Sequence, residues 1–389
     1  MKGPSDTLIE MFMEMNPDIE VEPIYLNERF HPTYAIKLAA DEAPDLVWMG
    51  MGFLGFAGEG AFLDISDRIK ADKDFDSSGI FPVLLDFYKY AGALYGIPTG
   101  VTTNVIAYNK DLFDKAGMAY PTDDWTMEEM VDMARKLTKD FDGDGVNDQW
   151  GIADWDSTGQ TSLLYGGPMF NEDGTKILID RPIARDMLVT FYNMVFNYKC
   201  HPQPSEAQTL FGSGSLRAFR SGKVAISGIA AWGRGLARTI EDFDWDVVMY
   251  PSYKGQRGVY MSGEAYLISA ATKSPDEAYR FLKFTTTEEW ARLMKGSYVP
   301  ALKKLAYSDF FLESDQKPKN AEAYLKMLEF GSMPFGHPAR TELTRAYGAA
   351  SDRLLLPEGD KDKITSIDEF MNLAVKDMQK ALDDFNAEH

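Results

Sequence analysis

The chain has 389 residues, a formal net charge of −20, and 45% apolar residues. This length exceeds what one hydrophobic core usually organises, so we expect two domains. The acidic balance argues against nucleic acid and anionic membrane surfaces as partners, and no apolar run approaches the roughly 18 residues of a membrane span. The single cysteine, Cys200, excludes an internal disulfide.

The first elements are predicted from apolar periodicity. A helix is expected from Thr7, because apolar residues fall on one stripe until Asn16-Pro17 ends the pattern. The run 19–22 alternates apolar and acidic residues as a strand does. Asp45 to Met49 follows a turn at Ala43-Pro44 and is typical of a buried strand.

Residues 92–138 carry the densest local signals. Gly96 lies between Ala93-Leu94-Tyr95 and Ile97-Pro98 and predicts a turn between short strands. The run 105–108 has the length of a strand, and the following short helix is expected to open at 109–111 with Asn109 and to end at Gly117. Thr126 and Glu129 predict a capping box for a longer helix.

Strand and helix patterns then alternate to the end of the chain, which indicates an α/β architecture. Helices are expected at 180–198, 207–220, 275–284, 287–295, 320–330 and 366–386, and strands at 224–229, 245–250 and 265–269. Ser274 with Glu277 and Ser366 with Glu369 predict two further helix caps. No low-complexity linker is found, so the two domains are expected to be interleaved.

These elements carry a family resemblance. The string YNKDLFDKAG at 108–117, within its order of strand, short helix and long helix, resembles the lobe crossover of family 1 extracellular solute-binding proteins of ABC importers, the maltose- and oligosaccharide-binding type. APDLVWMG, FRSGKVAISGIAAWG, WDVVMYPSYKG and GSYVPALKKL extend the resemblance in the same order over nearly the whole chain. Shared order over this length is far more specific than one short motif.

The resemblance implies a fold and a function. The fold would be a two-lobe, periplasmic-binding-protein-like α/β structure with a hinge, one lobe comprising 1–110 with 268–313 and the other 111–267 with 314–389. The protein would be a bacterial monomer outside the cell or in the periplasm, and no enzyme. It would capture a carbohydrate, expected to be an oligosaccharide, in an interlobe cleft. Hinge closure around the ligand would then let the protein deliver it to the permease subunits. In this family an export signal and a first strand precede the first helix. Neither is found in this sequence. A lipid-anchored full-length precursor is one of the forms that we expect.

Residues 140–149 resemble a calcium loop. Asp140, Asp142, Asp144 and Asp148 hold loop positions one, three, five and nine, with glycine at six and the Val146 carbonyl at seven. The glutamate usual at position twelve is replaced by Gly151. In some members of the resembled family the residue after position nine completes the shell, and Gln149 stands there. The sequence predicts structural Ca²⁺, with a metal-free acidic turn as the alternative.

The ligand site is expected to be aromatic, because a sugar presents an apolar C–H face ringed by hydroxyls. By resemblance, Trp232 is the stacking residue, with a core tryptophan at a strand end as the alternative. Trp48 lies at the carboxyl end of a strand, where open α/β sheets bind ligands, and a plain core role is its alternative. The weaker candidates, each with a core or surface role as the alternative, are Trp155, Tyr165, Thr102, Glu264, Tyr298 and Arg340.

Two other functions remain open at this stage. A carbohydrate-active enzyme would use paired carboxylates, but the acidic clusters lie at helix starts and in the calcium-like loop. No GxSxG, HExxH or Walker motif is present, and Cys200-His201 are better explained as buried neighbours, so no catalytic residue is predicted. A binding protein for a peptide or an organic acid would depend on Arg257 or Arg340 more than on Trp232.

Overall fold

The computed structural model describes residues 4–25, 30–50, 52–155, 159–212, 216–296, 298–333, 336–356 and 359–388. The chain divides into two compact units, each built from non-consecutive segments. Unit 1 comprises Met1–Thr102, Ser262–Phe311 and Gly336–Pro338, and unit 2 comprises Thr103–Met261, Leu312–Phe335 and Ala339–His389.

The chain passes between the units inside long strands. We expected boundaries at 110, 267 and 313, near the ends of predicted elements. Strand β4 (Gly96–Asn109) instead changes unit after Thr102, and strand β8 (Val259–Ile268) changes after Met261. A continuous buried strand gives no local signal at such a point, because its residue pattern is unbroken.

Unit 1 is built on antiparallel strand pairs. Strand β1 (Leu46–Met49) pairs with the end of β8, with Trp48 opposite Tyr266, and β9 (Val299–Pro300) pairs with the start of β4. A short hairpin joins β2 (Lys89–Tyr90) to β3 (Ala93–Leu94). The helices are α1 (Pro4–Met15), α2 (Phe30–Ala39), α3 (Phe53–Gly58), α4 (Ser66–Ala71), η1 (Ser77–Gly79), α5 (Pro82–Phe87), α13 (Pro275–Phe284), α14 (Glu288–Leu293), α15 (Lys303–Ala306) and α16 (Asp309–Leu312).

The core of unit 1 joins the first helix to helices near residue 280. Leu8 and Phe12 of α1 pack against Phe281 and Phe284 of α13 and Trp290 of α14. The Phe12 and Phe281 rings meet edge to face at 5.0 Å. This packing explains why α1 forms, because its apolar stripe is covered by aromatic side chains.

Unit 2 combines antiparallel and parallel pairs. The second half of β4 pairs antiparallel with β6 (Val224–Ala230) and with β7 (Trp245–Val248), while β5 (Trp150–Ala153) runs parallel to β6 and β10 (Gly331–Ser332) runs parallel to the start of β8. The helical elements are α6 (Lys110–Lys115), α7 (Met127–Leu137), α8 (Gln160–Leu163), α9 (Pro182–Tyr192), η2 (Asn193–Asn197), α10 (Pro204–Phe211), α11 (Arg217–Arg220), η3 (Ala231–Gly233), α12 (Arg234–Ala237), α17 (Glu322–Lys326), η4 (Met327–Phe330), α18 (Arg340–Leu354) and α19 (Ile367–Glu388).

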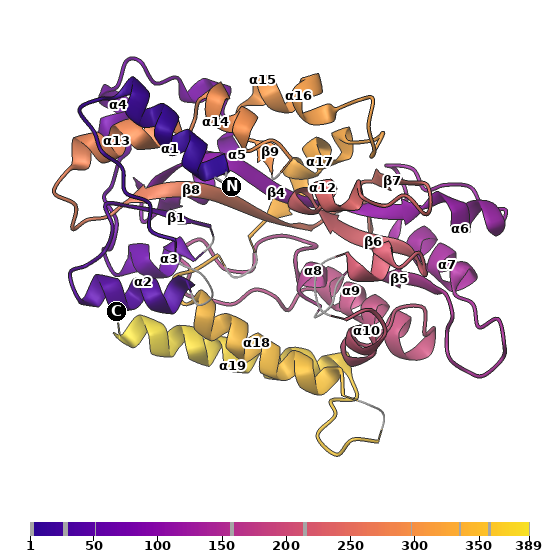
Figure 1. Cartoon of the computed structure of the whole chain (residues 1–389). Coiled ribbons are helices and arrows are strands. Elements are labelled where there is room, and N and C mark those ends of the chain that lie inside the picture. Colours follow the sequence, from indigo (N-terminus) through magenta and orange to yellow (C-terminus); the bar gives the residue numbers. More distant parts are fainter. Residues whose placement is uncertain are drawn as a thin grey trace. The chain divides into compact units, whose positions relative to one another are not determined.

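Helices α18 and α19 lie side by side and pack with α9 into an apolar cluster of unit 2 (Figure 1). Leu343 and Tyr347 of α18 and Phe370 and Met378 of α19 are fully buried there. On the sheet of unit 2, α7 packs against β5 and β6. Among the described residues, no helix combines the length and apolar character needed to cross a membrane.

Several local predictions are confirmed. Thr126 and Glu129 form both bonds of the capping box of α7. The Ser366 hydroxyl accepts from the Glu369 backbone N–H at 3.1 Å at the start of α19. The Asn109 side chain caps α6, and Gly117 takes the left-handed conformation just beyond it, with φ of 63°.

Other local predictions are wrong. Gly96 begins β4, and the hairpin turn lies at Ala91-Gly92, where φ is positive at both residues. Gly96 is required for packing, because a Cβ there would lie 3.2 Å from the Tyr88 ring and from the Tyr266 carbonyl oxygen.

Three further expectations also differ from the structure: a strand at 19–22, a side-chain cap from Ser274 and one continuous helix at 207–220. Ile19 and Val21 pack against the α1 core without forming a strand, because no neighbouring strand pairs with them in the described residues. Ser274 precedes α13 without a side-chain cap bond. The expected helix 207–220 consists of α10 and α11, and residues 213–215 between them lie outside the described part of the chain.

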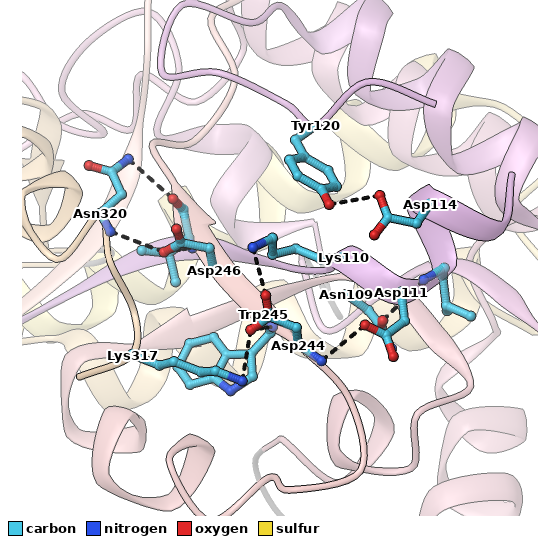
Figure 2. Close-up of polar contacts among 12 residues, drawn as sticks. Asn109, Lys110, Asp111, Asp114, Tyr120, Asp244, Trp245, Asp246, Lys317 and Asn320 are labelled. Atoms are coloured by element: carbon cyan, nitrogen blue, oxygen red, sulfur yellow. Dashed lines mark hydrogen bonds and ion pairs between the residues drawn. The ribbon is translucent and has the colours of Figure 1, made fainter. Parts of the chain in front are cut away.

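A polar network ties three segments of unit 2 together. Figure 2 shows Asp244 between Lys110 and Lys317, with Nζ–Oδ distances of 2.6 and 2.8 Å. Burial disfavours the charge on Asp244, but these two ammonium groups outweigh it and lower the pKa of the carboxyl to about 2. Asn320 adds bonds from its backbone N–H to Asp246 and from its side-chain amide to the Val247 carbonyl, so the segment after residue 312 is fastened to β7.

His201 is buried behind β5 and is held neutral. Its side chain is 4% exposed, and Nδ1 lies 2.7 Å from the Pro202 carbonyl oxygen. Nε2 has no hydrogen-bond partner in the part of the chain that the structure describes. Burial lowers the pKa of this imidazole to about 4, because a protonated ring would carry an uncompensated charge in the core.

We therefore expect unit 2 to lose stability as the pH falls from 6.5 to 4. Between these values the unfolded chain binds a proton that folded His201 does not, so the free energy of unfolding decreases with falling pH. The loss attributable to His201 should reach roughly 3 kcal/mol below pH 4. Denaturant unfolding at a series of pH values should show a shallower decline in His201→Leu. An equally steep decline in the variant would contradict this assignment.

Candidate functional site

In unit 1, two strands place a carboxylate beside an indole. Trp48 of β1 and Glu264 and Tyr266 of β8 lie on the same face, because alternate residues of a strand point the same way. The Trp48 Nε1–H donates to Glu264 Oε2 at 2.8 Å. The Tyr298 ring lies 6.4 Å from the Trp48 ring, and all four side chains are half-buried. Three of the sequence-predicted ligand residues, Trp48, Glu264 and Tyr298, are thus brought together.

The floor of this cluster is fixed by close backbone contacts. A Cβ at Gly50 would lie 3.3 Å from both carboxylate oxygens of Glu264, and one at Gly100 would lie 2.8 Å from the Tyr298 Cβ. The Thr99 hydroxyl donates to the Glu264 carbonyl oxygen at 3.0 Å. These glycines let the carboxylate and the tyrosine approach the strands closely, so the three side chains are held in place before any ligand arrives.

The electrostatics of the cluster are those of an uncompensated acid. Burial raises the pKa of Glu264 above its ordinary value, and only the Trp48 hydrogen bond opposes this. Burial and the nearby Glu264 charge raise the pKa of Tyr298 to about 12, so its hydroxyl stays protonated. The site therefore contains hydrogen-bond acceptors from Glu264, a hydroxyl from Tyr298 and the half-buried Trp48 indole, which also packs against Tyr266 and Trp290.

In unit 2, an indole and a carboxylate follow the carboxyl ends of the parallel strands β6 and β5. Trp232 lies in η3 directly after β6 and is 47% exposed, the highest exposure of any candidate aromatic. Asp154 follows β5, and the Gly228 position on β6 approaches its carbonyl, with 2.5 Å from a Cβ at Gly228 to that oxygen. Ligands of open α/β sheets bind at such strand ends.

Asp154 is a candidate that the sequence predictions missed. It has a positive φ of 54°, which is uncommon for a residue with a side chain. Its side chain reaches solvent, yet crowded surroundings raise the pKa of the carboxyl above its ordinary value. The available signal was an acid directly after the short apolar run 150–153 and before Trp155, which parallels the position of Glu264 beside an apolar strand.

Trp155 and Tyr165 lie in the packed interior of unit 2. Trp155 is 2% exposed and its ring lies 6.3 Å from Phe191, while Tyr165 is fully buried and donates its hydroxyl to the Pro251 carbonyl at 2.9 Å. This placement favours the core alternative for both residues. Loop length could not be read from the sequence, so their depth below the surface was not predictable.

Thr102 and Arg340 stand apart from the clusters. Thr102 is 3% exposed within β4, at the last residue of unit 1 before the chain enters unit 2. Arg340 is the first residue of α18, and its Nε makes no hydrogen bond among the described residues. No hydrogen bond or ring contact in the described part of the chain links either residue to Trp48, Glu264 or Trp232.

The acidic loop between α7 and β5 brings three carboxylates together. One oxygen each of Asp140, Asp142 and Asp148 lies within 4.8 Å of the others, and all three side chains are exposed. Gly143 and Gly145 take positive φ values of 79° and 87°, which allow the chain to turn around these oxygens. Backbone N–H groups of Gly145 and Gly143 lower the pKa of Asp140. Three ionised carboxylates on a tight turn fit a hard cation such as Ca²⁺.

The other predicted metal ligands have different roles in the loop. Asp144 Oδ1 accepts from the Val146 N–H at 2.8 Å and lies outside the group of three. The Gln149 side-chain amide donates to the Leu137 carbonyl at 2.6 Å, which joins the end of α7 to the start of β5. A carboxamide that donates through its nitrogen keeps its oxygen as an acceptor, so Gln149 remains compatible with coordination.

The fold is shared with solved carbohydrate-binding proteins. The ABC substrate-binding protein Lmo0181 of Listeria monocytogenes, solved in complex with cycloalternan, is 26% identical, with a TM-score of 0.83 over 97% of this chain and 95% of that one. The sugar-binding protein MalE of Xanthomonas citri is 19% identical, with a TM-score of 0.82 over 98% of this chain and 95% of that one.

Sequence comparison agrees with the structural comparison. The mannitol-binding protein of Pseudomonas aeruginosa is 23% identical over 332 residues, which are 78% of this chain and 72% of that protein. The family model described as bacterial extracellular solute-binding protein matches residues 4–292. With two interleaved units and a match over most of its length, this chain belongs to the bacterial extracellular solute-binding protein family of ABC transporters.

Proposed function

We propose that this protein captures a carbohydrate, in particular an oligosaccharide, outside the cell and delivers it as a monomer to the permease of an ABC importer. The observation that carries the proposal is the half-buried group of Trp48, Glu264 and Tyr298 in unit 1. Its aromatic faces match the apolar C–H face of a sugar, and its carboxylate and hydroxyl match the ring of sugar hydroxyls.

The exposed Trp232 supplies a second aromatic plate in unit 2. It follows a buried strand, and the next residue, Gly233, is itself buried. A Cβ at Gly233 would lie 3.1 Å from the Leu216 side chain, so the indole stands on a tightly packed turn. A large apolar side chain exposed on such a support is typical of a binding surface.

The ligands of related proteins support the proposal. The Listeria protein was solved with cycloalternan, and the Pseudomonas protein is named for mannitol. Both compounds are rich in hydroxyl groups and uncharged, which is the chemistry that the unit 1 cluster offers to match. Because the identities are 26% and 23%, these names support a hydroxyl-rich solute in general and no particular sugar.

We propose hinge closure as the mechanism. The chain passes between the units within β4 and β8, near residue 311 and on either side of the segment 336–338, so a few residues at these crossings can absorb a change in orientation. A ligand that contacts groups of both units stabilises the closed state through those contacts, and the permease would recognise that state.

The two alternatives are less well supported. Arg257, expected to matter for an anionic solute, donates to the Asp123 carbonyl at 2.6 Å and lies over the Phe330 ring, so it has a structural role in unit 2. An enzyme acting on glycans would release product, which a binding protein does not do. Incubation with the bound glycan followed by chromatography separates these functions.

A panel of oligosaccharides and polyols should identify the ligand by thermal shift. A ligand that binds the folded state raises the melting temperature by mass action. Small-angle scattering of the protein with that compound should give a smaller radius of gyration. Stabilisation without any compaction at saturation would contradict hinge closure, and the absence of stabilisation by any carbohydrate would contradict the proposed function.

Trp232→Ala should weaken carbohydrate binding and leave the unliganded fold intact. Loss of the stacking plate removes roughly 2–3 kcal/mol of apolar contact, or about 30- to 150-fold in affinity. Calorimetric titration measures this loss, and a melting curve measures stability. Trp155→Ala is the matched control, because this indole is buried and its removal should lower stability by about 3–5 kcal/mol. Unchanged affinity with lower stability in Trp232→Ala would assign Trp232 to the core.

We also propose that the 140–149 loop binds structural Ca²⁺ through Asp140, Asp142 and Asp148, with Asp144, Val146 and Gln149 as further ligands. The ion would supply positive charge that offsets the mutual repulsion of these aspartates. The loop joins α7 to β5 through the Gln149–Leu137 bond, so its order contributes to the packing of unit 2.

Removal of calcium with a chelator should lower the melting temperature of the wild-type protein, and added Ca²⁺ should restore it. Asp140→Asn should abolish this response, because it removes one charge from the three converging carboxylates, and Asp144→Ala, which removes a carboxylate outside that group, should reduce it. Asp132→Asn on the exposed face of α7 is the matched control, since it removes the same charge from outside the loop. Superimposable melting curves with and without chelator would contradict the calcium proposal.

A further inference from the structure

We infer that Glu264 sets the charge class of the ligand: the site accepts an uncharged carbohydrate and rejects anionic relatives such as uronates, aldonates and sugar phosphates. This inference rests on the proposed function and deepens it. Glu264 acts as a specificity-determining residue at the proposed unit 1 site, through its charge as well as its hydrogen bonds.

The first observation is that Glu264 has no counter-ion. Its carboxylate accepts one side-chain hydrogen bond, from Trp48 Nε1, and makes no ion pair among the described residues. The lysines and arginines of unit 1 that form ion pairs do so with other acids, including Arg68 with Asp276 and Lys283 with Asp72. A half-buried carboxylate normally has partners for its lone pairs. Because Glu264 has only the Trp48 N–H among the described residues, its remaining lone pairs are available to a ligand.

The second observation is that the described groups packed closest to the Glu264 carboxylate are uncharged. The Gly50 backbone lies against both carboxylate oxygens, and the Trp48 and Tyr298 rings flank the site. A sugar hydroxyl can donate to these oxygens, whereas a ligand carboxylate or phosphate placed here would face a like charge in a partly desolvated position.

The third observation is that the cations nearest to Trp232 in sequence are engaged elsewhere. Arg234 is 1% exposed and pairs with Glu313 at 3.1 Å, and Arg238 pairs with the same carboxylate at 2.6 Å. Asp154, at the neighbouring strand end, makes no ion pair in the described part of the chain. Among the described residues, the candidate surface of unit 2 therefore adds Asp154, a second acid without an ion pair, while Arg234 and Arg238 are both held by Glu313.

Arg340 is the place where an anionic group would be held if the inference is wrong. It is half-buried at the start of α18, and its Nε makes no hydrogen bond among the described residues. An anion that bound here would be attracted by the guanidinium and by the helix N-terminus. Arg340→Ala therefore distinguishes an anion site from the charge selection that we assign to Glu264.

The test compares matched neutral and anionic probes by calorimetric titration at low salt. The pairs are D-glucose with D-glucuronate, maltose with maltobionate, and D-mannitol with mannitol 1-phosphate. In the wild-type protein, a neutral probe should bind at least tenfold more tightly than its anionic partner. Glu264→Gln should reduce this ratio at least fivefold while neutral affinity falls less than tenfold, because the amide oxygen still accepts from Trp48 and from a sugar hydroxyl.

Glu42→Gln is the control, since it removes an equal charge from an exposed position of the same unit. It should leave the ratio unchanged, and melting curves should show that both variants are folded. An anionic probe that binds as tightly as its neutral partner, above all if Arg340→Ala abolishes that binding, overturns the inference. So does a ratio that is the same in Glu264→Gln and the wild-type protein. Binding of no probe from either class would overturn the inference, whereas the proposed function is overturned only if the wider carbohydrate panel also gives no stabilisation.

Discussion

Strand register along β4 and β8 is the constraint on which both candidate surfaces depend. The pairing of β8 with β1 places Glu264 on the same face as Trp48, and a slip of one residue would turn Glu264 into the core and Ala265 outward. The pairing of β4 with β6 likewise fixes where β6 ends and therefore where Trp232 stands. Because both strands pass from one unit to the other, the residues that can carry a hinge belong to the strands that position the ligand groups.

The protein treats its buried acids in two different ways. Glu313, 6% exposed, pairs with Arg234, the first residue of α12, and with Arg238, which directly follows that helix, so its charge is opposed and α12 is fastened to the segment after residue 312. Glu264 receives only an indole N–H. Removing one partner of the first group would leave a buried unpaired charge, which is costly. Glu264 is half-buried and has no ion pair among the described residues, so in the site that we propose the donors of a ligand would meet its charge.

The carboxylates of the calcium-like loop in unit 2, like Glu264, have acceptor capacity that the described residues of the protein do not use. Its carboxylates already accept backbone N–H groups, including Gly145 N–H to Asp140 Oδ2 at 2.9 Å and Phe141 N–H to Asp148 Oδ2 at 2.7 Å. These bonds shape the loop so that three carboxylates converge. A cation would strengthen an arrangement that the backbone bonds favour, because each oxygen retains a free lone pair.

The sequence by itself determined the elements with strong local chemistry. Thr126 and Glu129 start α7, Asn109 starts α6, and the aspartate spacing forms the acidic loop, because each depends on residues a few positions apart. The α/β class and the interleaved units followed from the alternation of patterns and from the family resemblance. Tertiary structure decided which of these residues meet. Trp48 and Glu264 are 216 residues apart and come together only through strand pairing, and the depth of Trp155 and Tyr165 depends on loops that the pattern does not specify. Register and burial are set by contacts between distant segments, and no local signal in the chain encodes them.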